Sequence, residues 1–189
     1  NVIFMTVSTG VGAGIISRGR IFHGHFGFSG EIGHTIVEPS SPVRCTCGNR
    51  GCLMALCGTL GLSDRYELCL REGMVSKLGF RAGEVPKIDG MLLEEGVKSG
   101  DEIASRLFRE SAEYIGIGIY NIYQVVNPQT VILGGGLMRM GFGFFDLICK
   151  KFNSLVRNMV YEELEIVLAE LGTGAGLLGA AFLPHRGEG

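Results

Sequence analysis

The chain carries Gly30-Glu31-Ile32-Gly33-His34 and then Cys45-Thr46-Cys47-Gly48-Asn49-Arg50-Gly51-Cys52. Three thiols and one imidazole within a short span match the Cys3His ligand set of a structural zinc site. The glycines of the second segment allow the loop to fold back, so that three sulfur atoms can converge. The predicted Zn²⁺ ligands are His34, Cys45, Cys47 and Cys52.

A disulfide is the alternative for these thiols. Cys45 and Cys47 are too close in sequence to bond comfortably with each other, but either could pair with Cys52. Six cysteines would also permit three bridges. The ligand types and their spacing favour zinc. The remaining cysteines lie in apolar, helix-like contexts typical of buried thiols: Cys57, Cys69 and Cys149.

Glu31 lies three residues before the proposed ligand His34. A carboxylate beside an imidazole that a metal holds in place is typical of a polar binding pocket. A role for Glu31 that supports the metal site without touching a ligand stays open.

Composition restricts the classes of function. The chain has 189 residues, of which 46% are hydrophobic, and a net charge of -2. This length and hydrophobic content suffice to bury a core and indicate one domain, or one domain and a piece of another. This balance gives no electrostatic footprint for nucleic acid, and no apolar run is long enough to span a bilayer. We therefore expect no direct nucleic-acid contact, no membrane insertion and, without a visible secretory signal, a cytoplasmic protein.

The hydrophobic pattern indicates an α/β domain, because strands come first and then alternate with helices. Expected strands cover residues 2–7, 130–133 and 165–168, and a hairpin covers 15–22 with its turn at Arg18-Gly19. Expected helices are short pieces within 54–78, a long helix from Asp101 to Val126 that Asn127-Pro128 stops, an amphipathic helix over 145–159, and a small-residue helix over 175–183 that should pack closely against another element.

Two glycine-rich segments follow strands. The backbone N–H groups of Thr9-Gly10-Val11-Gly12-Ala13-Gly14, which we expect to lie in a turn over residues 8–14, could line an anion, although a tight hairpin turn explains the segment equally well. It is no P-loop, because it enters a hairpin and lacks the lysine. Gly134-Gly135-Gly136 could give a flat surface for a base or ribose, or be a plain strand-to-helix turn. Two such turns in one domain favour a nucleotide cleft.

Together these motifs resemble the ROK family, which groups sugar kinases with sugar-responsive transcriptional repressors. The resemblance covers nearly the whole chain, and its most specific part is Glu31 to His34 with Cys45 to Cys52. It implies the C-terminal lobe of the actin-like ATPase/hexokinase (ribonuclease H-like) fold as a single unit over residues 1–189, without the N-terminal lobe. Within it, residues 30–54 would form the zinc and sugar loop, and residues 127–183 the nucleotide side.

The resemblance also implies roles for individual residues. Besides the four zinc ligands, Glu31 and His34 would hydrogen-bond sugar hydroxyls. Thr9, Gly10 and Gly12 would lie at the phosphate of ATP, and Gly134 and Gly135 at its adenosine. An intact kinase would use Mg²⁺ with ATP, and family members often form dimers.

Two features depart from the family pattern. The chain contains neither the Asp-x-Gly-Gly-Thr phosphate motif nor the Asn-Asp pair that supplies the general base, so we expect it not to catalyse phosphoryl transfer by itself. Met54 stands where the family usually has a sugar-binding glutamate. A thioether cannot replace a charged acceptor, and the affinity or specificity for sugar should differ.

These features leave two functions open. The first is the C-terminal lobe of a kinase that transfers phosphate from ATP to a hydroxyl of a hexose or N-acetylhexosamine, and the retained glycine segments favour it. The second is the sugar-sensing domain of a repressor, in which sugar shifts a conformational equilibrium. Met54 favours the second, as does Ala13, where many family kinases have glycine. A zinc-stapled domain without ligand is disfavoured by Glu31.

Overall fold

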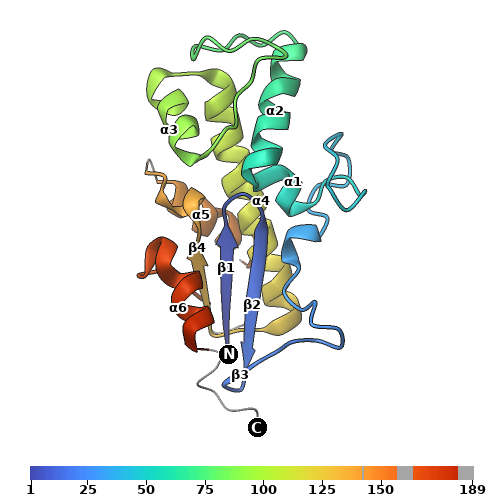
Figure 1. Ribbon diagram of the computed structural model, residues 1–189, viewed down its shortest axis with the longest axis vertical. Helices are drawn as coiled ribbons and strands as arrows, with labels where there is room; N and C mark the ends of the chain where they lie inside the picture. The colour runs from blue at the N-terminus through green and yellow to red at the C-terminus, as the bar shows by residue number, and fades with distance from the viewer. Residues whose placement is uncertain (142, 157–163, 183–189) are drawn as a thin grey trace.

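The computed structural model describes residues 1–141, 143–156 and 164–182. Its centre is a five-stranded mixed sheet with the strand order β3-β2-β1-β4-β5 (Figure 1). The strands are β1 (Val2–Val7), β2 (Val11–Ser17), β3 (Arg20–Ile21), β4 (Thr130–Gly134) and β5 (Glu165–Leu168). The strands expected over 2–7, 130–133 and 165–168 are confirmed.

The first strand lies inside the sheet, where β2 pairs with it antiparallel and β4 pairs with it parallel. Its side chains alternate strictly, and Ile3, Met5 and Val7 are fully buried. Such alternation directs one set of side chains to the core. The parallel pair β1 and β4 requires a long crossover, and residues 8–129 supply it.

The hairpin at the sheet edge turns at Arg18 (φ 51°) and Gly19 (φ 74°), as predicted. Positive φ angles at both central residues are those of a type I′ turn, whose twist matches the flanking strands. The glycine segment before it differs from the prediction, because Val11 to Gly14 belong to β2 and the turn is confined to Ser8–Gly10. Pairing with β1 satisfies the backbone of these residues, which outweighs the weak strand preference of glycine.

The helices are α1 (Leu53–Cys57), α2 (Thr59–Arg71), α3 (Gly90–Ser99), α4 (Glu102–Val126), α5 (Phe144–Val156) and α6 (Ala175–Phe182). Short 3-10 turns cover Ile32–His34 (η1), Gly136–Arg139 (η2) and Gly172–Gly174 (η3). Residues 72–78 are not helical, and α3 was not predicted. The expected residues 157–159 and 183 lie outside the described part of the chain.

The long helix α4 passes behind the strands in Figure 1. Asp101 caps its N-terminus, where the carboxylate accepts a hydrogen bond from the Ala104 N–H, and Asn127 caps its C-terminus in the left-handed conformation. Both residues are common helix caps. A Cβ added to Gly118 would lie 2.5 Å from the side chain of Leu53. This close approach fixes α1, and with it the residues that precede α1, against the core.

The close packing expected of the small-residue helix is absent from the described part of the chain. In α6, Leu177 is 79% exposed, and the space beside Gly176 and Gly179 is open. No described helix combines the length and apolar composition needed to cross a membrane.

Candidate functional site

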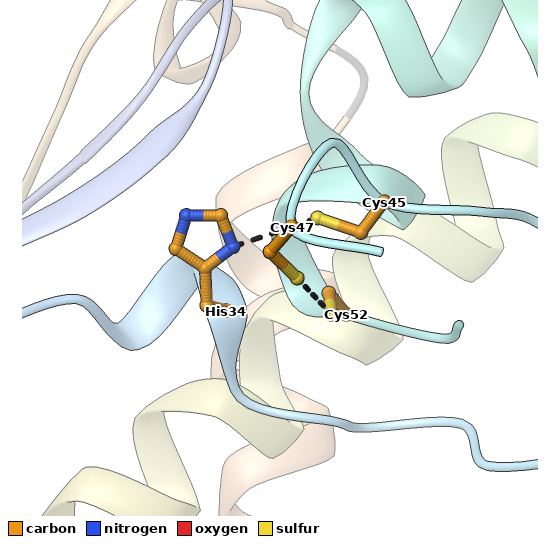
Figure 2. A group of neighbouring side chains, drawn as sticks. All are labelled: His34, Cys45, Cys47 and Cys52. Carbon is orange, nitrogen blue, oxygen red and sulfur yellow. Dashed lines mark hydrogen bonds between the residues drawn. The ribbon is translucent and has the colours of Figure 1, made fainter. Parts of the chain in front are cut away.

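The four predicted metal ligands converge in the structure (Figure 2). His34 ends η1, Cys45 and Cys47 lie in the loop that follows, and Cys52 immediately precedes α1. Their ligand atoms all lie within 4.8 Å of one another. The sequence prediction that these residues come together is therefore confirmed.

The spacing of the ligand atoms fits zinc. Cys47 Sγ lies 3.7 Å from Cys52 Sγ, and Cys45 Sγ lies 3.5 Å from His34 Nδ1. A tetrahedral ion with ordinary Zn–S and Zn–N bonds requires S···S separations of about 3.8 Å and S···N separations of about 3.6 Å. A disulfide would bring two sulfur atoms to about 2.0 Å, and all six cysteines are free.

Glycine allows the loop to take this shape. Cys45 accepts a hydrogen bond from the Gly48 N–H and donates its own N–H to Asn49, which closes a tight turn. Gly48 has a φ of 90°, a conformation that favours glycine. A Cβ on Gly51 would lie 1.8 Å from the carbonyl oxygen of Glu38. These glycines allow the loop backbone to direct the three sulfur atoms toward one point, while Cys45 and Cys52 are themselves buried.

The thiols differ in their environments. The backbone N–H of Asn49 lowers the pKa of Cys47 to about 6, whereas burial raises the pKa of Cys52 to about 12. Cys57 and Cys69 are buried as predicted, and Cys149 is half-buried. Since metal binding requires thiolates, a cation would favour the charged form of all three ligating sulfurs.

The imidazole of His34 turns its two nitrogens in different directions. Nδ1 faces Cys45, and Nε2 lies 3.8 Å from Oε2 of Glu31. A metal on Nδ1 leaves the proton of the neutral ring on Nε2. The side chains of His34 and Glu31 are 36% and 59% exposed, respectively. This pair therefore offers a donor and an acceptor to solvent at the edge of the metal site.

The segment that carries this pair lies directly on β2. A Cβ on Gly30 would lie 1.8 Å from the carbonyl oxygen of Ala13, and one on Gly33 would lie 2.1 Å from that of Val11. The Ala13 N–H also donates to the Gly30 carbonyl. Two backbones in such close contact place Glu31 and His34 at a fixed distance from the β1–β2 turn.

The turn Ser8–Gly10 also lies against the beginning of α2. The Thr59 N–H donates to the carbonyl of Ser8, and a Cβ on Gly58 would lie 2.6 Å from the carbonyl oxygen of Thr9. Among the described residues, Thr59 has a buried hydroxyl oxygen without a hydrogen-bond partner. Thr59 was not among the predicted site residues. The available sequence signal for it was Gly58-Thr59, at the start of α2.

The second glycine segment reaches the same turn. Gly135 (φ 97°) crosses the end of β1, where an added Cβ would lie 2.3 Å from the Val7 carbonyl oxygen, and one on Gly136 would lie 3.5 Å from Ser8 Oγ. Gly134 is buried against Phe4. The second glycine segment, at least 120 residues after the first in sequence, thus lies beside the turn Ser8–Gly10.

A cavity of about 280 Å³ lies elsewhere, between residues 38–43 and the helices α2 and α4. Its charged lining includes Arg65, which donates to Glu110 and to the carbonyl of Leu56. None of Glu31, His34 or the two glycine segments lines it. The candidate site lies apart from this cavity, at the ends of β1 and β4 and beside the metal loop.

Comparison with known proteins gives consistent relatives. The chain is 29% identical over 188 residues to a glucokinase of Halalkalibacterium halodurans and 31% identical over 183 residues to an N-acetylmannosamine kinase of Escherichia fergusonii. It is 29% identical over 179 residues to a xylose repressor of Caldicellulosiruptor bescii. These matches cover 100%, 97% and 95% of this chain, but 57%, 56% and 44% of the relatives.

A solved structure supports the same assignment. The ROK family glucokinase of Streptomyces griseus, in complex with glucose and AMPPNP, superposes with a TM-score of 0.78 at 32% identity, over 98% of this chain and 61% of that one. This likeness confirms the predicted α/β, actin-like ATPase fold. The ROK family model matches residues 1–186. The chain belongs to the ROK family.

Proposed function

We propose that residues 1–189 are the C-terminal sugar- and nucleotide-binding lobe of an ATP-dependent sugar kinase. The reaction would transfer a phosphoryl group from ATP to a hydroxyl of a hexose or N-acetylhexosamine. The observation that carries this proposal is the convergence of three features: the Glu31–His34 pair beside the metal ligands, the turn Ser8–Gly10, and the segment Gly134–Gly136.

Zinc would be held by His34, Cys45, Cys47 and Cys52. When bound it supplies no chemical step but staples the loop and fixes the ring of His34, as metals do for imidazole ligands. Cys45 and Cys52 pack with Ala55 beneath the loop, so the metal and this small apolar cluster would stabilise the same segment. We place the protein in the cytoplasm, where thiols remain reduced.

The sugar would be recognised by Glu31 and His34. The 3.8 Å between His34 Nε2 and Glu31 Oε2 is too long for a direct hydrogen bond. A single hydroxyl oxygen can lie about 2.8 Å from both atoms, accepting from the imidazole and donating to the carboxylate. The arrangement therefore suits a sugar hydroxyl better than it suits an internal ion pair.

The phosphates of ATP would lie at Thr9, Gly10 and Gly12, and its adenosine at Gly134 and Gly135. The turn lies at the beginning of α2, where Gly58 provides no side-chain cap. The partial positive charge of a helix N-terminus stabilises phosphate. Mg²⁺ would arrive bound to the phosphates of ATP.

The general base would come from another part of the protein, because the sequence has no Asn-Asp pair. We infer that this chain alone binds ligands without transferring phosphate. We also expect the intact protein to form a homodimer, with no nucleic-acid contact from this segment.

A repressor-type sugar sensor is the second candidate, since a xylose repressor is among the relatives and Met54 is not a charged acceptor. A coupled assay on the intact protein with ATP, Mg²⁺ and either glucose or N-acetylmannosamine separates the two. Turnover that Glu31→Gln reduces supports the kinase. Sugar binding without AMPPNP binding or turnover supports the sensor and rejects the kinase.

A further inference from the structure

The cavity between residues 38–43 and the helices α2 and α4 takes no part in the candidate site. Its volume of about 280 Å³ far exceeds a packing defect, because voids in protein interiors rarely exceed the size of a water molecule. It lies just below the range of about 300–1,000 Å³ that is typical of small-molecule sites. The lining residues Arg106 and Glu72 are exposed, so the cavity reaches the surface. A compact molecule can therefore enter it.

The inner wall of the cavity is held in place by Arg65. This side chain is 7% exposed and donates hydrogen bonds to the carbonyl of Leu56 and to Glu110. Its guanidinium also lies over the ring of Tyr114, 5.6 Å from the centroid. Leu56 and Leu107, each 1% exposed, add apolar surface to the same wall. A guanidinium with several partners keeps one orientation, and the wall is therefore preformed.

Several hydrogen-bonding groups of the lining have no partner among the described residues. Arg106 uses only Nε, on Glu110, and its terminal nitrogens remain free to donate. The hydroxyl of the buried Ser41 accepts a hydrogen bond from a backbone N–H, but its own proton has no acceptor. The hydroxyl of Tyr114 and the carboxylate of Glu72 are also without partners. The lining thus offers both donors and acceptors to an occupant.

The charge of the lining restricts what this occupant can be. Three carboxylates and two guanidinium groups leave a small negative excess: Glu38, Glu72, Glu110, Arg65 and Arg106. Burial raises the pKa of Cys69 and of Tyr114, so both are neutral near pH 7. An anion would supply only acceptors and meet the negative excess, whereas an ammonium group would leave the donors of Arg106 and Ser41 unmatched. Hydroxyl groups both donate and accept, and an uncharged polyhydroxylated molecule therefore suits the lining best.

One wall of the cavity is part of the metal loop. Residues 38–43 lie between the metal ligands His34 and Cys45 in sequence. Gly51, which immediately precedes the ligand Cys52, accepts a hydrogen bond from the N–H of residue 38 and donates one to the carbonyl of residue 43. A molecule that holds residues 38–43 in place therefore also stabilises the loop around the metal.

We propose that this cavity is a second ligand site, which takes a small uncharged polyhydroxylated molecule of the size of a monosaccharide. Occupancy of the site stabilises the metal loop and slows the loss of zinc. Such coupling is reciprocal, so zinc-loaded protein binds the molecule more tightly than zinc-free protein does. The inference goes beyond the kinase reaction, because no residue of the cavity belongs to the proposed sugar or ATP sites.

The test follows methyl resonances by NMR in the zinc-loaded intact protein, labelled at leucine and valine. Val43, Leu68 and Leu107 line the cavity and report on its occupancy. The probes are glucose, xylose and myo-inositol, with glucosamine and glucose 6-phosphate as matched molecules of positive and negative charge. At least one uncharged probe should shift these three residues' resonances in a saturable way at concentrations up to about 10 mM. It should bind more tightly than either charged probe.

Two substitutions on α4 should each weaken this binding by about three- to tenfold: Tyr114→Phe removes one hydroxyl, and Arg106→Gln removes the guanidinium donors. Tyr120→Phe and Arg109→Gln are the matched controls, because both residues lie on the same helix but outside the cavity lining. Glu31→Gln should leave the binding in the cavity unchanged. Transfer of zinc to a chelator should be about fivefold slower when the bound probe saturates the site.

The contradicting results are distinct. If no uncharged probe shifts the three residues' resonances, or if a charged probe binds more tightly, the assignment of the cavity is wrong. It is also wrong if Glu31→Gln abolishes the shifts while Tyr114→Phe and Arg106→Gln leave them unchanged, because the shifts would then originate at the Glu31–His34 pair. Binding that leaves the rate of zinc release unchanged would reject the link to the metal loop.

Discussion

Nε2 of His34 lies 3.8 Å from Oε2 of Glu31, while Nδ1 of the same ring faces Cys45. One imidazole therefore connects the metal loop to the surface where a ligand would bind. Holding the ring from one side fixes the direction of the N–H on the other. This relationship links the stability of the metal loop to ligand recognition.

Cys47→Ser should release zinc and lower the thermal midpoint together, because folding of the loop is coupled to its metal. For a chain of this size a loss of about 3 kcal/mol corresponds to a decrease on the order of 10 °C. Atomic absorption and calorimetry on the same sample measure both quantities. Cys149→Ser, at a half-buried thiol outside the cluster, should leave the zinc content unchanged. Full zinc occupancy in Cys47→Ser would contradict the assignment.

Glu31→Gln should weaken sugar binding by about tenfold and leave zinc in place, because a charged acceptor is lost while the ligand set is intact. Titration calorimetry with the best-binding sugar gives the affinity. Glu38→Gln is the control, since that carboxylate accepts from Ser40 within the same loop. An unchanged affinity in Glu31→Gln would leave Glu31 with a supporting role at the metal site.

Gly33→Ala should destabilise the protein by about 2 kcal/mol or more. The new Cβ would lie 2.1 Å from the Val11 carbonyl oxygen, so two backbones must separate. Gly14→Ala, in the strand β2 on which Gly33 packs, has open space around its Cβ and should be neutral or slightly stabilising. Urea unfolding compares the two variants. Equal stabilities would show that η1 does not press on β2.

Asp101 should make stability depend on acid pH. Burial alone would raise the pKa of its carboxyl, but hydrogen bonds from the N–H groups of Ala104 and Lys77 and from the hydroxyls of Tyr66 and Ser76 hold it below the usual value. The folded state thus prefers the charged form. Its stabilising contribution is present above about pH 4 and is lost as the pH falls through the lowered pKa.

The variant Asp101→Asn tests this network. At neutral pH its free energy of unfolding should be about 2 kcal/mol lower than that of the unsubstituted protein. Between pH 4 and pH 2 its free energy of unfolding should decrease less than that of the unsubstituted protein. Asp89→Asn removes the charge of a cap with a single hydrogen bond, from Leu92, and should cost less. Identical pH profiles for Asp101→Asn and the unsubstituted protein would exclude the network as the source of acid sensitivity.

Local patterns predicted much of the fold. The alternation in β1, the caps Asp101 and Asn127 of α4, and the Arg18-Gly19 turn are all decided by neighbouring residues. The metal ligands were also predictable, because Cys and His at this spacing have few other uses. The sequence did not predict α3, because Gly90 and Gly96 lower its helix propensity. Asp89 still caps it, and its Leu93 is buried in the core.

Long-range contacts explain what the sequence could not reveal. Gly12 and Gly14 suggested a turn, but pairing with Thr6 and Phe4 makes them part of β2. The contact of Met54 with Gly10 joins residues more than 40 positions apart. No local pattern encodes such a contact, and it emerges only when α1 packs against α4 and the sheet.

The most direct test of the central claim is a sugar titration of the zinc-loaded intact protein before and after chelation. If the metal holds His34 for sugar recognition, glucose or N-acetylmannosamine binds the zinc-loaded protein, loses most of its affinity when zinc is removed, and regains it when zinc is restored. Binding that is unchanged by zinc removal, in protein verified to be metal-free and folded, would contradict the claim.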